Sequence, residues 1–248
     1  MRVQRGTGWR SEDEPGYWEW PSASSLVRTC WRVVVEADGT WTTGGAEYWG
    51  LAFSRSPDGH HLAQLAGPSL RPRVMDVRAG EVSWGVDLQP HVFWRGLAKA
   101  GTVDALRDLP TERVGDQWWY ELGGVRLPVP AALDLDEAVR ALSIAGLLVG
   151  EPLVARVLAE AHADGPEVGV PERTLRRRFR ATTGLRRAQV EQVRRAREAY
   201  ALLQAGSSLA DAAAEADFSD QAHMTRELRR LAGRTPAQLL ELKGFSMS

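Results

Sequence analysis

No segment limits the fold of this chain more than Glu172–Arg180, which reads E-R-T-L-R-R-R-F-R. In a helix, four of its arginines occupy positions i, i+3, i+4 and i+7 and share one face: Arg173, Arg176, Arg177 and Arg180. Leu175 and Phe179 fall on a different side, where they can be buried. A helix with an apolar anchor and a dense arginine face needs an anionic partner, and nucleic acid is the first candidate.

The positive charge of the chain is concentrated around this segment. The 248 residues carry a formal net charge of -1, and their 44% apolar and 25% charged residues are ordinary for a soluble globular protein. Residues 1–150 have a net charge of -4, and residues 151–248 have a net charge of +3. Between Arg173 and Arg197 there are ten arginines and one acid, Glu191. The charge therefore indicates a local anion-binding surface in the second part of the chain.

Two differently built domains are expected. All ten tryptophans lie at or before Trp119, and the remainder of the chain has none. From Tyr17 to Pro130, short β-prone runs alternate with Gly, Pro and Asp turns, which is typical of a small barrel or sandwich. The clearest predicted strands are Cys30–Val35, Tyr48–Phe53, Arg73–Val77 and Val82–Leu88. We also predict a helical segment around Trp94–Leu109.

The second part of the chain reads as a series of helices. Asp134 and Glu137 predict a capping box for a first amphipathic helix, which packs on the barrel or pairs with a second copy of itself. We favour packing within the chain. The predicted helices that follow the capping box and surround the arginine helix are Leu153–Ala163, Arg187–Ala205, Leu209–Ala216, Asp220–Leu231 and a last helix ending near Lys243. The short helix Leu209–Ala216 is followed by a three-residue turn and by the helix Asp220–Leu231. This order is typical of a helix-turn-helix.

The C-terminal hundred residues resemble the DNA-binding domain of AraC/XylS-type transcription regulators. The residues that carry the resemblance are E-R-T-L-R-R-R-F-R-A-T-T-G (Glu172–Gly184), R-R-A-R-E-A-Y-A-L-L (Arg194–Leu203) and A-D-F-S-D-Q-A-H-M-T-R-E-L-R-R-L-A-G-R-T-P-A-Q (Ala216–Gln238). The resemblance implies two helix-turn-helix units joined by one long helix. It divides the chain into a β-rich domain over 1–130, a linker helix over 131–150 and a DNA-binding domain over 151–248.

The resemblance also assigns roles to individual residues. The candidates for reading bases are Arg173, Arg176 and Arg177 in the first unit, and Gln221, Ala222, His223, Thr225 and Arg226 in the second. The candidates for phosphate contacts are Arg178, Arg180, Arg229 and Arg230. A linking helix of about 19 residues spans ~28 Å at ~1.5 Å per residue, close to the ~34 Å between successive major grooves on one DNA face.

Two positions depart from the family pattern. The interval Ala161–Pro171, before the arginine helix, contains Gly165 and Pro166, which interrupt a scaffold helix. The first unit is therefore either shortened or uses Leu153–Ala163 as its scaffold through a longer turn. In the second unit, Asp217 occupies a turn position usually held by glycine, and we expect it to adopt the left-handed conformation.

The N-terminal half resembles, less specifically, the cupin-like domain that precedes such DNA-binding domains. Gly67–Val77 and Trp84–Pro90 carry this resemblance. In the family such barrels bind a small effector, mediate dimerisation, or do both, and the sequence identifies no effector. Trp49 and Trp84 are our candidates for the lining of a ligand pocket, while the other tryptophans are expected to fill the core.

The composition argues against several other classes. A single cysteine, Cys30, excludes an intramolecular disulfide and a zinc site built from several thiolates. The histidines and acids available in the first half lack a metal-binding spacing, so we expect no metal, no cofactor and no enzymatic activity. No apolar run is long enough to cross a membrane and no signal peptide is recognisable, so we expect a cytoplasmic protein. Two alternatives stay open: an interaction protein that kept the helical domain without specific DNA binding, and a barrel enzyme fused to a DNA-binding domain.

Overall fold

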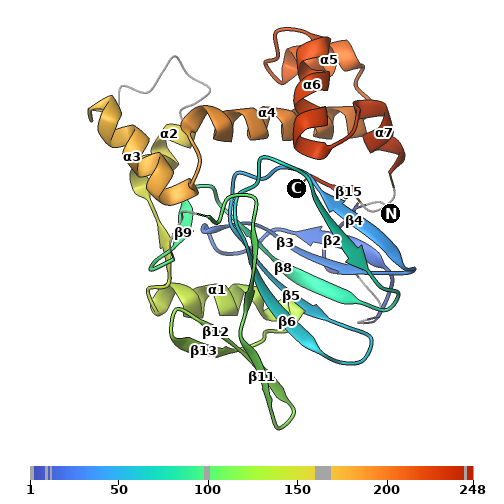
Figure 1. Ribbon diagram of the computed structural model, residues 1–248, viewed down its shortest axis with the longest axis vertical. Helices are drawn as coiled ribbons and strands as arrows, with labels where there is room; N and C mark the ends of the chain where they lie inside the picture. Colours follow the sequence, from blue (N-terminus) through green and yellow to red (C-terminus); the bar gives the residue numbers. More distant parts are fainter. Residues whose placement is uncertain are drawn as a thin grey trace.

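The computed structural model describes residues 3–8, 11, 13–97, 101–159, 169–242 and 245–247. A β-rich region over residues 16–128 is followed by a helical region, as Figure 1 shows. The predicted α+β fold with two differently built parts is thereby confirmed. Among the described residues, no helix combines the length and the apolar character that a membrane span requires.

The largest sheet of the β-rich region contains seven strands in the order β1-β2-β3-β8-β5-β6-β10. Its strands are β1 (Val3–Arg5), β2 (Gly16–Trp20), β3 (Val27–Val34), β5 (Gly50–Arg55), β6 (His61–Ala66), β8 (Val82–Leu88) and β10 (Leu106–Leu109). All neighbours in this sheet are antiparallel except β1 and β2. The four strands read from the sequence are confirmed, with β7 (Arg73–Val77) and β8 at the predicted bounds.

Among the described residues, three smaller sheets accompany the main sheet. One joins β4 (Gly39–Thr43) to β7 and to β15 (Phe245–Ser246), a short strand at the C-terminal end that pairs in parallel with β4. The other two comprise β11 (Thr111–Val114), β12 (Gln117–Leu122) and β13 (Val125–Pro128), and β9 (Val92–Trp94) with β14 (Leu148–Gly150). The end of the chain thus returns to the β-rich region.

Strand alternation divides the main sheet into two faces. On β8, Val82, Trp84, Val86 and Leu88 point into one apolar core, and the residues between them point to the opposite face. Gly85 is required where β8 passes β5, because a Cβ atom there would lie 2.4 Å from the Leu51 carbonyl oxygen. The apolar core that contains Val82, Trp84, Val86 and Leu88 is covered by the helix that follows β13.

That helix, α1 (Leu135–Ile144), buries Leu135, Val139 and Leu142 in the core of the β-rich region. Its apolar face is therefore used within the chain, as we favoured. The predicted capping box is wrong: Asp134 ends the 3-10 turn η1 (Ala132–Asp134), and its side chain makes no capping hydrogen bond. Residues 131–150 also include β14, so this segment holds a strand paired with β9 in addition to the helix.

The predicted helical segment around Trp94–Leu109 is also wrong for the residues described. Trp94 ends β9, and Leu106–Leu109 form β10 at the edge of the main sheet. Residues 98–100 of the predicted segment lie outside the described residues. Gly96, Gly101 and Asp104 have positive φ angles, which are typical of turns and do not occur in a right-handed helix.

Six helices follow β14 in the described residues: α2 (Pro152–Ala159), α3 (Glu172–Thr183), α4 (Arg187–Gln204), α5 (Leu209–Glu215), α6 (Gln221–Ala232) and α7 (Pro236–Glu241). The predicted residues 160–163 of the second helix, the Gly165–Pro166 interruption and Lys243 lie outside the described residues. The long helix α4 separates two apolar clusters. Its first half packs with α2 and α3 and its second half packs with α5, α6 and α7, which gives the arrangement seen in Figure 1.

Local signals set the helix ends. Gly184 closes α3 in the left-handed conformation, with a φ of 74°. Asp217 has a φ of 57°, so its expected left-handed conformation is confirmed. The Ser208 hydroxyl accepts a hydrogen bond from the backbone N–H of Asp211 at the start of α5.

Candidate nucleic-acid interface

In the arginine helix α3, helical spacing places the apolar residues on one face and the arginines on another. Leu175 and Phe179 are buried, and they pack with Val154 and Val157 of α2. The four arginines of the predicted stripe and Arg178 are exposed. Helix α2 therefore supplies apolar support behind α3, which is the role that a scaffold helix has in a helix-turn-helix.

The arginines of α3 differ in their ion pairs. Arg178 pairs with Glu151, with 2.8 Å between its Nη1 and the carboxylate Oε2. Arg176 lies 3.7 Å from Glu172 through an exposed i,i+4 contact, which contributes little in solvent. Within the described part of the chain, no ion pair is found for three arginines, Arg173, Arg177 and Arg180. These three guanidinium groups are the most available to an anionic ligand.

The second unit is built by α5, a turn and α6. Asp220 caps α6 by accepting a 2.6 Å hydrogen bond from the backbone N–H of His223. The His223 ring lies 3.1 Å from the Ser219 hydroxyl and edge-on to Phe218. Met224 and Leu228 are buried against α4. The turn and the first residues of α6 thus have a fixed geometry.

The predicted contact residues of this unit lie on the outer side of α6. Gln221, Ala222 and Arg226 are exposed at its N-terminal end, and the neighbouring His223 and Thr225 are half-buried. Arg229 and Arg230 are exposed near its C-terminal end. Arg230 pairs with Glu227, with 2.8 Å between Nη2 and Oε2, which leaves Arg229 as the more available of the two.

The two candidate recognition helices lie at opposite ends of α4 (Figure 1). Helix α4 has 18 residues, which corresponds to ~27 Å at ~1.5 Å per residue. The β-rich region contacts the C-terminal end of each recognition helix. The indole N–H of Trp49 donates to the carbonyl of Thr182 at 3.2 Å, and the backbone N–H of Gly45 donates to the carbonyl of Leu231 at 2.9 Å. The N-terminal ends, which carry the predicted base-reading residues, do not take part in these contacts.

A buried ion pair joins α4 to the same part of the β-rich region. The Arg197 guanidinium binds the Glu47 carboxylate through two parallel hydrogen bonds, one of them 2.8 Å from Nη1 to Oε1, and it also lies 5.2 Å from the centre of the Tyr48 ring. Burial opposes the ionisation of Glu47, yet Arg197 holds the pKa of this carboxyl below its ordinary value of 4.5. Sequence reasoning missed this pair. The sequence pattern that could have revealed it is the position of Arg197, four residues after Val193 and three before Tyr200. This spacing places Arg197 on the buried apolar face of α4.

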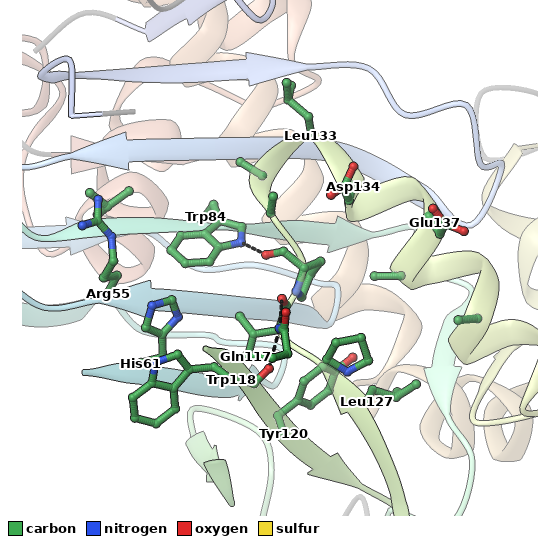
Figure 2. Close-up of a pocket in the computed structure, with 18 of the residues that line it drawn as sticks. Arg55, His61, Trp84, Gln117, Trp118, Tyr120, Leu127, Leu133, Asp134 and Glu137 are labelled. Carbon is green, nitrogen blue, oxygen red and sulfur yellow. Dashed lines mark hydrogen bonds between the residues drawn. The ribbon is translucent and has the colours of Figure 1, made fainter. Parts of the chain in front are cut away.

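The two predicted pocket residues have different surroundings. Trp84 lines a cleft of about 1030 Å³ between the main sheet and the β12–β13–α1 segment (Figure 2). A second cavity of about 340 Å³ lies on the opposite face of the main sheet, towards β4 and β7. Trp49 lines neither of them and is buried beside α3. Among the described residues, no group of three or more His, Cys, Asp and Glu side chains is arranged to hold a metal ion.

Comparison with known proteins identifies one part of the chain. Residues 166–241 match the family described as a helix-turn-helix domain. The match covers α3 to α7 and confirms the resemblance of the C-terminal part to AraC-type DNA-binding domains. The helical region from α3 to α7 is therefore a helix-turn-helix domain, and this match supports a DNA-binding role in transcription regulation.

Two solved structures of ToxT from Vibrio cholerae are also similar to the chain. The first has 8% sequence identity and a TM-score of 0.46, and the alignment covers 86% of this chain and 96% of ToxT. The second, from strain O395, has 9% identity and a TM-score of 0.42, with 86% and 95% covered. The comparison with curated proteins gave no match.

Proposed function

We propose that this protein regulates transcription by placing α3 and α6 in successive major grooves of one DNA face. The observation that carries the proposal is the helix-turn-helix match over residues 166–241, in which both recognition helices keep their N-terminal ends exposed. In helix-turn-helix proteins, the N-terminal residues of the recognition helix contact the base edges. The length of α4 supports contact with two grooves, because ~27 Å plus the offsets of the two helices approaches the ~34 Å helical repeat.

In this proposal, specificity comes from a small set of side chains. Arginines suit the O6 and N7 atoms of guanine, and glutamine suits adenine, each through two hydrogen bonds. Arg173, Arg176 and Arg177 read bases in the first groove. The side chains that read bases in the second groove are Gln221, Ala222, His223, Thr225 and Arg226.

Phosphate contacts supply most of the affinity and make it dependent on salt. Arg180 and Arg229 are exposed, and no ion pair engages them in the described residues, so they are the strongest candidates. Arg178 and Arg230 are held by Glu151 and Glu227, and they must exchange a carboxylate for a phosphate in order to contribute.

The β-rich region modulates DNA binding through its contacts with the helical region. It contacts the C-terminal end of α3, the C-terminal end of α6 and the middle of α4. A change in this region, caused by a small effector or by pairing with a second copy of the chain, would alter the relative positions of the two recognition helices. The buried Glu47–Arg197 pair is the contact most sensitive to such a change, because separating it leaves charges without partners.

Selection of bound sequences from random double-stranded DNA tests the proposal. We expect a site of about 20 base pairs with two conserved blocks one helical turn apart. The variant Arg176→Ala/Arg177→Ala should relax one block and Gln221→Ala/Arg226→Ala the other, with a loss of roughly 1–3 kcal/mol for each base contact removed. The variant Arg107→Ala, on the exposed strand β10, is the control and should select the wild-type site.

The possible results separate the alternatives. If the selection yields no motif, the helical region does not recognise a specific DNA sequence, and the interaction-protein alternative is favoured. If only the block that depends on Gln221 and Arg226 is found, α3 does not read bases and the two-groove arrangement is wrong.

A further inference from the structure

The cleft lined by Trp84 has a floor with two adjacent rows of side chains on the main sheet. In one row, His61 on β6 is paired with Arg55 on β5, and Arg55 is paired with Val82 on β8. In the next row, Trp84 is paired with Arg32 on β3. Directly opposite residues in antiparallel strands have Cβ atoms ~4.5–5.5 Å apart, so these side chains form a continuous surface. Strands β12 and β13 and the segment leading into α1 line the rest of the cleft.

Aromatic rings form one side of the cleft, as Figure 2 shows. The ring of His61 stacks on Trp118, with 5.2 Å between the centres and 16° between the planes, and Trp84 approaches His61 edge-on at 5.9 Å. The indole N–H of Trp84 donates to the carbonyl of Pro130 at 3.0 Å, which fixes the Trp84 ring. Flat rings in a fixed orientation favour planar aromatic ligands, which prefer stacked or edge-on contacts.

Charged residues of both signs line the cleft: Arg32 and Arg55 come from the main sheet, and Asp116, Asp134 and Glu137 come from the segments that cover it. Burial lowers the pKa of His61, and the nearby Arg55 and Arg113 guanidinium groups and the His60 ring lower it further. Arg113 is itself paired with Asp116 at 3.5 Å, so Arg55 is the guanidinium group from the main sheet that we consider for a ligand. The Nδ1 atom of His61 is buried and has no hydrogen-bond partner among the described residues. Asp134 and Glu137 lie on the other side of the cleft, away from Arg55 in Figure 2. An anionic group is therefore better placed on the main sheet beside Arg55 than against Asp134 and Glu137.

Arg55 can accept a new partner at low cost. It pairs with Asp13 at 2.7 Å, but the two side chains are 36% and 77% exposed. Ion pairs with this exposure contribute only about 0–1 kcal/mol. A carboxylate bound inside the cleft, where solvent is partly excluded, can replace Asp13 and form a stronger charge-assisted hydrogen bond.

We propose that this cleft is a binding site for planar aromatic anions, with the anionic group at Arg55 and the rings packed against Trp84 and Trp118. The cleft volume of about 1030 Å³ is enough for a ligand with two or three fused rings. The inference goes beyond the proposed DNA binding. It concerns a different region of the molecule, and its test does not involve DNA.

A matched pair of probes, 2-naphthoate and 2-naphthamide, tests the proposal on the full chain. The two compounds have the same ring system and differ in the charge of one group. We expect the quenching of tryptophan fluorescence, verified by calorimetry, to show that naphthoate binds at least tenfold more tightly than naphthamide. Lowering the pH from 8 to 5.5 should tighten naphthoate binding, because a bound anion favours the protonated form of His61. Naphthamide should show no such dependence.

Substitutions locate the site. Arg55→Gln should weaken naphthoate binding roughly 10- to 100-fold, the range expected for a charge-assisted hydrogen bond, and should leave naphthamide binding unchanged. Trp118→Ala should weaken both probes. Arg107→Gln, which removes an exposed arginine that does not line the cleft, is the control. Thermal unfolding of each variant verifies that it is folded.

Three results would overturn the proposal. They are no saturable naphthoate binding at millimolar concentrations, equal affinities for naphthoate and naphthamide, and equal losses of naphthoate affinity in Arg55→Gln and Arg107→Gln. Because none of these measurements uses DNA, their outcome is independent of whether α3 and α6 recognise a DNA sequence.

Discussion

Glu47 and Arg197 are separated by 150 positions in the chain and form a buried ion pair between its two parts. Their side chains are 1% and 9% exposed. Such a pair contributes little compared with well-packed apolar residues, but removing one partner leaves an uncompensated charge in a medium of low dielectric constant. The pair therefore penalises any arrangement of the two parts that separates Glu47 from Arg197.

Glu47→Gln should lower the free energy of unfolding by about 3–5 kcal/mol at pH 7, measured by urea denaturation. The matched control is Glu112→Gln, which removes the carboxylate of an exposed pair with Arg126 and should cost less than ~1 kcal/mol. Because the pKa of folded Glu47 lies below 4.5, its contribution is present above pH 4.5 and is lost as the pH falls further. Equal losses in the two variants would show that the buried pair has no special contribution.

The contribution of Asp87 to stability changes with pH in the opposite direction to that of Glu47. Burial raises the pKa of Asp87 to about 6, against the opposing effect of Arg28. Folding therefore favours the protonated carboxyl, and the resulting stability is present below the ordinary pKa of 3.8 and is lost as the pH rises to about 6.

Asp87→Asn should remove this pH dependence. The amide oxygen can still accept the hydrogen bond from the indole N–H of Trp31, which is 3.3 Å from Asp87 Oδ1. At pH 7 the variant should be more stable than the wild type by on the order of 2–3 kcal/mol. Free energies of unfolding measured at several values between pH 4.5 and pH 7 provide the test, and parallel profiles for both proteins would contradict it.

At the scale of elements, the second helix-turn-helix unit depends on its turn. Asp217 follows α5 with a φ of 57°, and the N–H groups of Asp217 and Phe218 return to the carbonyls of Ala214 and Ala213. This geometry sets the angle between α5 and α6. It also brings Ser219 and Phe218 against the His223 ring at the start of the recognition helix.

The variant Asp217→Val should lower the free energy of unfolding by about 1–2 kcal/mol, because a β-branched residue is strained in the left-handed region. Asp217→Gly is the control and should be at least as stable as the wild type, since glycine adopts this conformation without strain. Urea denaturation compares the three proteins. A valine variant as stable as the glycine variant would show that the turn does not hold this conformation.

At the scale of the whole molecule, the net charge of -1 provides no general attraction to DNA. Attraction has to come from the local arginine surface, so the affinity of the proposed complex should fall steeply with salt. In the Arg180→Ala variant, the slope of log K against log salt should become shallower by about 1, the change expected for one lost phosphate contact. Arg107→Ala should keep the wild-type slope. An unchanged slope for Arg180→Ala would show that this residue does not contact a phosphate.

Local patterns in the sequence determined much of this protein. The arginine helix with its buried Leu175 and Phe179, the strands β7 and β8, and the left-handed Asp217 were all predicted correctly, because helix periodicity, strand alternation and turn geometry are fixed by neighbouring residues. The C-terminal helix-turn-helix domain was recognisable for the same reason, since its two motifs are continuous in the chain.

Only the tertiary structure decided how the parts meet. The Glu47–Arg197 pair, the return of β15 to β4 and the row of Val82, Arg55 and His61 join residues far apart in the sequence, and no local pattern specifies such partners. The wrong helix around Trp94–Leu109 has the same cause, because Leu106–Leu109 become a strand by pairing with the edge of β6. Sequence periodicity shows which face of an element is buried, whereas packing and strand register select what that face is buried against.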